Sequence, residues 1–138
     1  MPKIKTYNPK EVVMACGSHM ISGYADDSFI SIEANGDGIT KKVGCDGEIA
    51  RAISPDGTYK IKMTLLQQSD SNKFFTNRTT QDRDTGNGIF PILIKDLKGG
   101  LVFSADSAWC VKMSSVTRGK DTNNREWEID TADGVMTE

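Results

Sequence analysis

Few residues in this 138-residue sequence could carry catalytic or metal chemistry. His19 is its only histidine, and the three cysteines, Cys16, Cys45 and Cys110, stand far apart. A zinc site needs locally paired ligands such as Cys-x-x-Cys, and a cysteine nucleophile needs a histidine base beside it. Cys45 or Cys110 could in principle pair with His19, but an ordinary strand histidine is the simpler interpretation. We therefore predict no catalytic residue, no metal, no cofactor and no enzymatic activity.

Other short motifs imitate known sites without completing them. The acidic residues at 26–27 and 35–38 lack the alternating ligands and closing glutamate of an EF-hand. The glycines of segment 44–48 are not followed by the Gly-Lys-Ser/Thr of a phosphate-binding loop. Residues 77–79 fit a glycosylation sequon, but without a secretory signal we interpret the match as chance. The acidic and glycine-rich segments are typical of turns.

Composition and charge exclude several classes of protein. The chain has 17 basic and 19 acidic residues, so it offers no basic footprint for nucleic acid and no attraction to anionic membranes. Residues 1–10 lack the apolar core of a signal peptide, so we expect synthesis in a cytoplasm and buried, reduced cysteines. The length suits one domain, residues 1–138, in which polar residues 1–11 form an extended N-terminal arm.

The segment 59–66 gives the clearest signal for secondary structure. Apolar and polar residues alternate through it with a period of two, which is typical of a strand with one buried face. A helix over about residues 70–80 should follow, opened by Ser69-Asp70-Ser71-Asn72 and holding only Phe74 and Phe75 as large apolar residues. This helix can press only a narrow patch onto a sheet.

Repeated short strands separated by glycine turns predict the remaining architecture. The turn at 35–38 should join strands 28–34 and 39–43 as a hairpin. Pro91 places the strand at 89–95 at an edge or at a bulge. Trp109 and Trp127 occupy core-like alternating positions. The prediction is a mainly β protein, an antiparallel β-sandwich or barrel with one flanking α-helix.

The order of these motifs resembles a known family. The sequence runs from VGCDGE through SPDG and TLLQQS to the helix opening at SN, with ISGYADDSFISIE upstream and FPILIKDLKGG and AWCVKM downstream. Over roughly Val12 to Trp127 it resembles the small tail tube proteins of contractile-tailed bacteriophages. That family is related in fold to the tube subunits of type VI secretion systems and R-type bacteriocins.

The resemblance implies a structural role in a virion tail. Subunits would form hexameric rings that stack into a hollow tube inside a contractile sheath, with DNA passing through the lumen without sequence-specific binding. The implied partners are copies of the chain and the sheath, baseplate and tail-terminator proteins, with no membrane. The alternatives are another virion or secretion-system component, such as a sheath, baseplate or secretion tube protein, and less plausibly a β-sandwich ligand-binding module.

Two sets of residues are candidates for the surfaces of such an assembly. Polar residues of two strands are candidates for lining the lumen: Ser31, Glu33, Lys60, Lys62 and Thr64. A solvated strand face is the alternative interpretation of the lysines. Segment 44–58, rich in glycine, should be mobile in the monomer and become ordered when rings stack. Its candidates for contact with a neighbouring subunit are Glu48, Ile49, Arg51 and Ile53.

Overall fold

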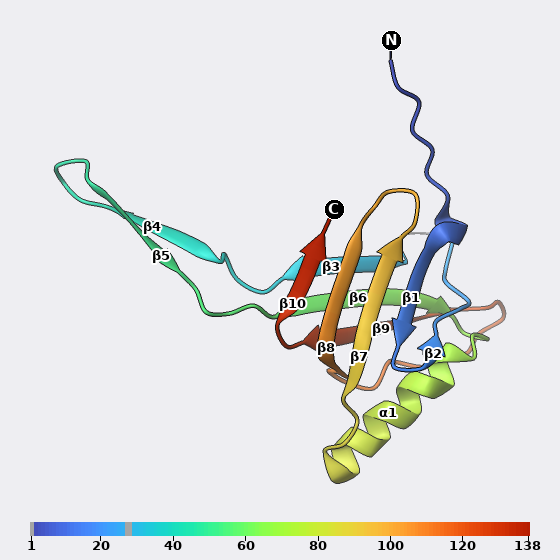
Figure 1. The fold of residues 1–138 in the computed structure, drawn as a ribbon. Coiled ribbons are helices and arrows are strands. Elements are labelled where there is room, and N and C mark those ends of the chain that lie inside the picture. Colours follow the sequence, from blue (N-terminus) through green and yellow to red (C-terminus); the bar gives the residue numbers. More distant parts are fainter. Residues whose placement is uncertain (1, 27–28) are drawn as a thin grey trace.

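Two layers of antiparallel strands cross each other, and one helix covers an open end between them (Figure 1). The computed structural model describes residues 2–26 and 29–138. The first layer contains β1 (Val12–Cys16), β2 (His19–Met20), β7 (Phe90–Asp96), β8 (Val102–Cys110) and β10 (Gly134–Thr137). The second contains β3 (Ile30–Ala34), β6 (Tyr59–Leu66) and β9 (Asn124–Thr131). The predicted class, antiparallel β with a flanking helix, is confirmed.

The long strand β8 joins the two layers. One of its edges pairs with β7 along most of its length. Its other edge is shared, because Ala105 lies opposite Gly134 of β10 and Ala108 lies opposite Thr131 of β9. The hydrogen-bonded order β2-β1-β7-β8-β9-β6-β3 is therefore one sheet folded across itself at β8, as in orthogonal sheet packing.

The core lies between the layers and follows the predicted alternation. Ile61, Met63 and Leu65 of β6 are buried, and so are Trp127 and Ile129 of β9. The facing layer contributes buried apolar side chains of β1, β7 and β8: Met14, Cys16, Ile92, Ile94, Phe103 and Ala105.

The central strands confirm one expectation and correct another. Of the two positions predicted for the strand that contains Pro91, an edge or a bulge, the structure shows the bulge: β7 lies between β1 and β8, and its register shifts between Phe90 and Ile92. That shift places an extra residue in β8, and a period-two pattern changes face at such a bulge. Cys110 is consequently buried, whereas Trp109 is only half-buried, and the core position predicted for Trp109 is wrong.

The helix α1 (Ser71–Thr85) runs past its predicted end at Thr80. It stops at Gly86, whose positive φ of 75° suits a residue without a Cβ, and the Gly86 N–H donates to the Asp82 carbonyl at 2.9 Å. Phe75 is fully buried, with its ring centroid 5.5 Å from that of Trp127. Phe74 is half-buried and stacks on His19 at 4.7 Å.

The predicted pairing of segments 28–34 and 39–43 is wrong. In the described part of the first segment, β3 pairs with β6, and Ile32 lies opposite Ile61. Strand β4 (Ile39–Val43) pairs instead with β5 (Ile49–Ile53). Polar bonds between Asn35 and Thr58 hold the two ends of the intervening chain together, with the Asn35 N–H 3.1 Å from the Thr58 carbonyl. The local sequence identified a change of chain direction after β3, but it did not identify β6 as the strand that pairs with β3.

Residues 2–8 extend away from the end of the sandwich at which the C-terminus also lies (Figure 1). Residues 2–8 have no regular secondary structure and lead into a short 3-10 helix, η1 (Pro9–Glu11). The strand β10 was not predicted. It depends on Gly134, where an added Cβ would come within 2.8 Å of the Phe103 ring.

Candidate assembly surfaces

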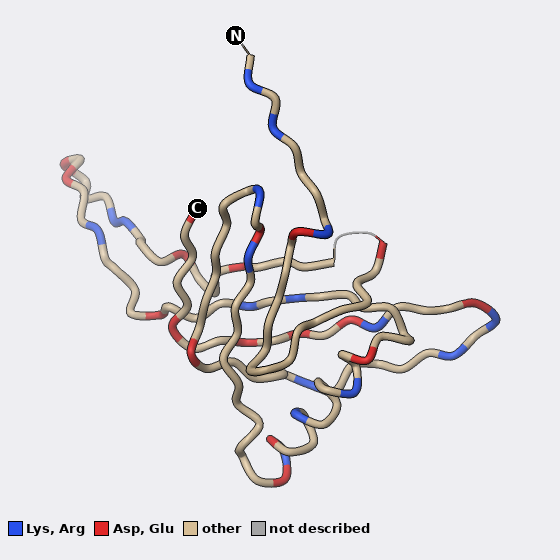
Figure 2. The backbone as a smooth tube through the Cα atoms, turned by 45° about the vertical axis from the view of Figure 1, so that its right-hand side comes forward, with Lys and Arg blue, Asp and Glu red and all other residues tan. Residues whose placement is uncertain are grey.

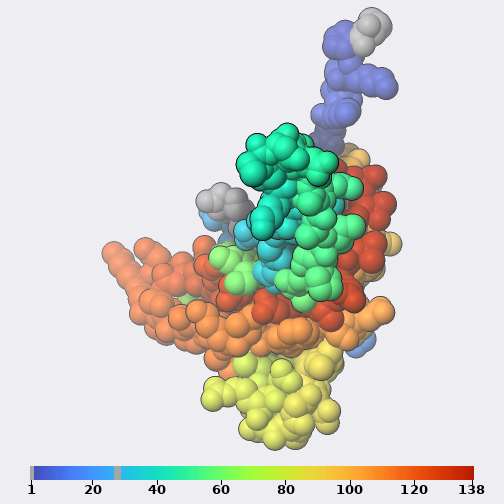
Figure 3. Space-filling view, turned by 90° about the vertical axis from the view of Figure 1, so that its left-hand side faces the viewer, coloured from blue at the N-terminus to red at the C-terminus, as the bar shows by residue number. Residues whose placement is uncertain are grey.

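A hairpin of β4 and β5 projects from the body of the molecule (Figure 1; Figure 3 views it end-on). We call residues 39–53 the projecting hairpin; every one of them is exposed. Its tip is a glycine turn in which the Gly47 N–H donates to the Gly44 carbonyl at 3.0 Å. Because the alternate residues of paired strands share a face, one face carries two aliphatic pairs around a basic pair: Ile39 and Ile53, Val43 and Ile49, and Lys41 and Arg51. We call these six residues the apolar–basic face.

The opposite face of the projecting hairpin is small and polar, with Thr40, Lys42, Ala50 and Ala52. The apolar–basic face leaves large aliphatic side chains in water, and Ile53 is 77% exposed. A lone two-stranded hairpin is marginally stable, and clustered exposed apolar groups mark interaction sites.

The predicted contact residues fall mostly on this face. Ile49, Arg51 and Ile53 point the same way along β5, so the structure brings them together. Glu48 lies beside the tip turn, where its N–H donates to Asp46 Oδ1 at 3.2 Å and its carbonyl accepts from Gly44. Sequence reasoning missed the partners on β4, because it paired that strand with the wrong neighbour.

The five candidates for the lumen share the outer face of the β3–β6–β9 layer. Ser31 lies opposite Lys62, and Glu33 lies opposite Lys60. Lys60 Nζ also lies 3.4 Å from Glu128 Oε1. Figure 2 shows acidic and basic positions beside one another on neighbouring strands of this layer. The face is therefore polar and mixed in charge.

The strand β9 adds acidic residues that the sequence analysis did not name. Glu126, Glu128 and Asp130 alternate with buried Trp127 and Ile129, so they lie on the same outer face. That alternation was the signal that could have identified them. The free edge of the layer is β3, which pairs with β6 alone among the described strands.

A hollow of about 640 Å³ opens at the end of the sandwich away from α1. It lies between β3 and the ends of β1, β7 and β10. Its lining is mainly apolar: Tyr7, Pro9, Val12, Phe29, Ile30, Ile32, Ile94, Leu101 and Met136. Three carboxylates join that lining, from Asp26, Asp96 and Glu138. We call this feature the acid-lined hollow.

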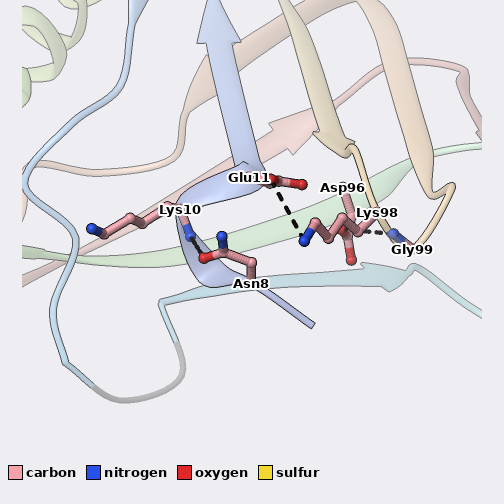
Figure 4. A network of polar contacts seen from close by, with 6 residues as sticks. All are labelled: Asn8, Lys10, Glu11, Asp96, Lys98 and Gly99. Atoms are coloured by element: carbon pink, nitrogen blue, oxygen red, sulfur yellow. Dashed lines mark hydrogen bonds and ion pairs between the residues drawn. The ribbon is translucent and has the colours of Figure 1, made fainter. Parts of the chain in front are cut away.

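Polar contacts join residues 8–11 to the turn after β7, next to the lining residues Pro9 and Asp96 of the acid-lined hollow (Figure 4). Lys98 Nζ lies 3.9 Å from Glu11 Oε1. Asp96 Oδ1 accepts a hydrogen bond from the Gly99 N–H at 3.0 Å, which closes the turn after β7. Asn8 Oδ1 accepts from the Lys10 N–H at 3.0 Å and caps η1. The lining residues of the hollow come from distant parts of the chain, from Tyr7 to Glu138, so no local sequence signal pointed to it.

The residues considered for catalysis are not grouped into a site. His19 Nε2 lies 3.0 Å from Ser71 Oγ, and the His19 ring stacks on Phe74, so this histidine contacts the helix. Cys16 and Cys110 are buried, whereas Cys45 is exposed at the tip of the projecting hairpin, so the prediction of burial is wrong for Cys45. Burial raises the pKa of the Cys110 thiol to about 11.

In the described part of the chain, no group of three or more histidine, cysteine, aspartate or glutamate residues is arranged to hold a metal ion. Among the described residues, no helix has the length and apolar character needed to cross a membrane.

The fold occurs in solved structures of contractile injection systems. The tube-terminating cap of the anti-feeding prophage shares it with a TM-score of 0.59 and 6% identity, over 99% of this chain and 94% of that one. The PVC sheath/tube terminator of an extracellular contractile injection system shares it with a TM-score of 0.60 and 10% identity, over 98% of this chain and 99% of that one. A chain of the PVC sheath–tube complex has a TM-score of 0.60 and 11% identity, over 96% of this chain and 91% of that one. At these identities the likeness concerns the fold.

A protein of known phage origin is similar in sequence. The structural protein ORF10 of Pseudomonas phage KPP10 is 28% identical over 135 residues, covering 92% of this chain and 78% of that protein. No protein-family model matches the chain. The resemblance to phage tail proteins predicted from the sequence is confirmed at this level: a phage structural protein in sequence, and tube-associated proteins of contractile particles in fold.

Proposed function

We propose that this chain is a structural subunit of the tail tube of a phage or phage-like particle, with no enzymatic activity. In this proposal residues 1–138 form one tube domain, and residues 1–11 are an arm that contacts a neighbour. The observation that supports it most strongly is the fold shared over nearly the whole chain with tube-associated proteins, together with similarity to a phage structural protein.

Ring closure would satisfy the exposed sheet edge. β3 carries unpaired backbone groups along one side, and natural proteins cover or pair such edges. A contact between two different surfaces of identical subunits generates a closed ring when the rotation closes, and a filament when it does not. In a hexameric ring, the β3 edge of each subunit would pair with a surface of the neighbouring subunit. Stacking of such rings would extend the tube.

The outer face of the β3–β6–β9 layer suits the lumen. Tight binding of DNA comes from clustered Lys and Arg that release counterions from phosphates. On this face Lys60 and Lys62 are balanced by Glu33 and Glu128, which lie opposite or beside them. Such a surface would let DNA slide without gripping it.

Stacking contacts are assigned to the projecting hairpin. Its residues Glu48, Ile49, Arg51 and Ile53 would contact a subunit of the adjacent ring and become ordered there. The remaining surface would face the sheath, baseplate and terminator proteins of the particle, and the protein would reside in the virion tail.

A second candidate function is that of tube terminator, because two of the structures that share the fold are a tube-terminating cap and a sheath/tube terminator. A terminator would form a single ring, whereas a tube subunit would form stacked rings. Sedimentation velocity and negative-stain electron microscopy of the purified chain at increasing concentration separate the two. Open-ended tubes support the tube subunit, single rings support the terminator, and a protein that stays monomeric contradicts both.

A further inference from the structure

Two surfaces of the described chain complement each other in polarity and charge. The apolar–basic face places Lys41 and Arg51 side by side between aliphatic pairs. The acid-lined hollow places Asp26, Asp96 and Glu138 around an apolar wall. Opposite charges within matching apolar surroundings are the pattern by which interfaces select a partner and fix its register.

The projecting hairpin extends away from the body that holds the hollow (Figures 1 and 3). Within one chain the two surfaces are therefore directed apart, and each needs a second molecule to cover it. Since they are different surfaces of the same chain, their contact would be heterologous and would propagate from copy to copy.

We propose that the apolar–basic face of the projecting hairpin docks into the acid-lined hollow of a second copy of this chain. Lys41 and Arg51 then meet the carboxylates of Asp26, Asp96 and Glu138. The inference rests on the proposed tube function, and it names the surface that receives the stacking hairpin.

The hollow has the size and chemistry for such an insertion. Its volume of about 640 Å³ lies within the range of pockets that bury a drug-sized molecule, so it has room for several aliphatic side chains. Ile94 forms part of its wall at 1% exposure, and Met136 is 40% exposed. Docking would remove apolar surface of both copies from water.

The charges in the hollow can accept a cationic partner. Asp26, Asp96 and Glu138 are the only charged residues among the described residues that line the hollow. Asp96 accepts a backbone hydrogen bond from Gly99 and keeps further lone pairs for a donor. Both incoming cations would find a carboxylate, which matters because a buried unpaired charge is costly.

Cross-linking tests the contact directly, with Cys45 at the hairpin tip as a native probe. In assembled full-length protein, Met136→Cys should form intermolecular links to Cys45 with a short bis-maleimide. Val135→Cys is the matched control, because Val135 is exposed on the same strand but does not line the hollow. Links should disappear when Cys45→Ser is added. Tubes that form normally but give no Met136 links, or equal links from Val135→Cys, overturn the inference and leave the tube function standing.

Charge exchange gives a second readout that does not depend on cysteine. The Lys41→Glu, Arg51→Glu variant should weaken self-association at least about tenfold, since like charges would then meet at the interface. Asp26→Lys, Glu138→Lys should do the same, and combining all four changes in one chain should restore assembly. Lys42→Glu, on the other face of the hairpin, is the control and should assemble normally. Assembly unchanged by either pair of reversals, or a combined variant no better than each pair alone, contradicts the proposed docking. Wild-type protein that never self-associates contradicts this inference and the tube function together.

Discussion

The indole N–H of Trp127 donates a buried hydrogen bond to the side-chain oxygen of Asn72, across 3.0 Å. The amide nitrogen of Asn72 donates in turn to the carbonyls of Leu66 and Gln67, at 2.9 and 3.1 Å. One side chain near the start of α1 thus joins the end of β6 to the middle of β9. The position of the helix on the sheet is fixed by a satisfied polar cluster as well as by apolar packing.

Removing this link should destabilise the protein markedly. Asn72→Ala would leave the Trp127 N–H and the two carbonyls short of partners, so the free energy of unfolding should fall by about 3 kcal/mol. Asn77→Ala changes the same residue type at an exposed position of the same helix and should have little effect. Urea denaturation followed by tryptophan fluorescence measures both. Equal stabilities of the two variants would show that the buried bond contributes nothing.

The two adjacent phenylalanines of α1 should differ in their contribution to stability. Phe75 is fully buried against Trp127 and Phe90, so Phe75→Ala should lower the free energy of unfolding by about 4 kcal/mol. Phe74 is half-buried, so Phe74→Ala should cost clearly less. Thermal denaturation of the two variants compares them. A larger loss for Phe74→Ala would place the helix in a different rotation on the sheet.

Stability should also decline at alkaline pH because of the buried thiols. Burial raises the pKa of Cys110 from 9.0 to about 11, and it raises the pKa of Cys16 further. Between about pH 9 and pH 11 the unfolded chain releases these protons while the native protein keeps them, so the free energy of unfolding falls as pH rises. This contribution is fully present below about pH 9.

The Cys110 thiol can be tested by its effect on that pH dependence. Cys110→Ala should reduce the alkaline loss of stability, measured as the change in urea midpoint between about pH 8 and pH 10. Cys45→Ala is the matched control, because the Cys45 thiol is exposed at the hairpin tip. The same alkaline loss in wild type and Cys110→Ala would exclude a contribution from this thiol.

The projecting hairpin should gain order on assembly. Its amides are bonded only within a two-stranded ladder that has no core, so residues 48–53 should exchange hydrogen quickly in the monomer and slowly in the tube. Amide exchange read by mass spectrometry measures both states. Strong protection of these residues already in the monomer would contradict the proposal. Normal assembly by an Ile49→Asp, Arg51→Glu variant would also contradict it.

The lumen candidates can be tested by chemical labelling of assembled tubes. With Cys45→Ser as background, Ser31→Cys and Lys62→Cys should react with a small maleimide but not with one attached to a large protein, because the lumen would exclude the bulky reagent. Lys73→Cys, on an exposed position of α1, is the control and should react with both. Bulky labelling at Ser31 and Lys62 would place that face on the outer wall.

The sequence predicted features in which a single local pattern decides the outcome. The alternation of 59–66 reports one buried face, and Ile61, Met63 and Leu65 are buried accordingly. Local pattern could not determine which strands pair. The chain bends at 35–38, with Gly36 and Gly38 at positive φ, but this is not a hairpin turn, because the strand beyond it leaves the body and pairs with β5.

The reversal of face along β8 and the acid-lined hollow were missed for related reasons. One extra residue in β8 reverses the face of every later side chain, and this turned Trp109 away from the core. The hollow combines side chains as far apart in sequence as Tyr7 and Met136, so only the folded chain brings them together. Sequence analysis named the candidate surface residues of β3, β5 and β6, and the structure added those of β4 and β9.

Electron cryomicroscopy of assemblies grown from the purified chain tests the central claim most directly. We expect hollow tubes of stacked hexameric rings, with the β3–β6–β9 outer face toward the lumen and the projecting hairpin of each subunit touching the adjacent ring. A protein that remains monomeric at high concentration, or that forms assemblies without a lumen, would contradict the account.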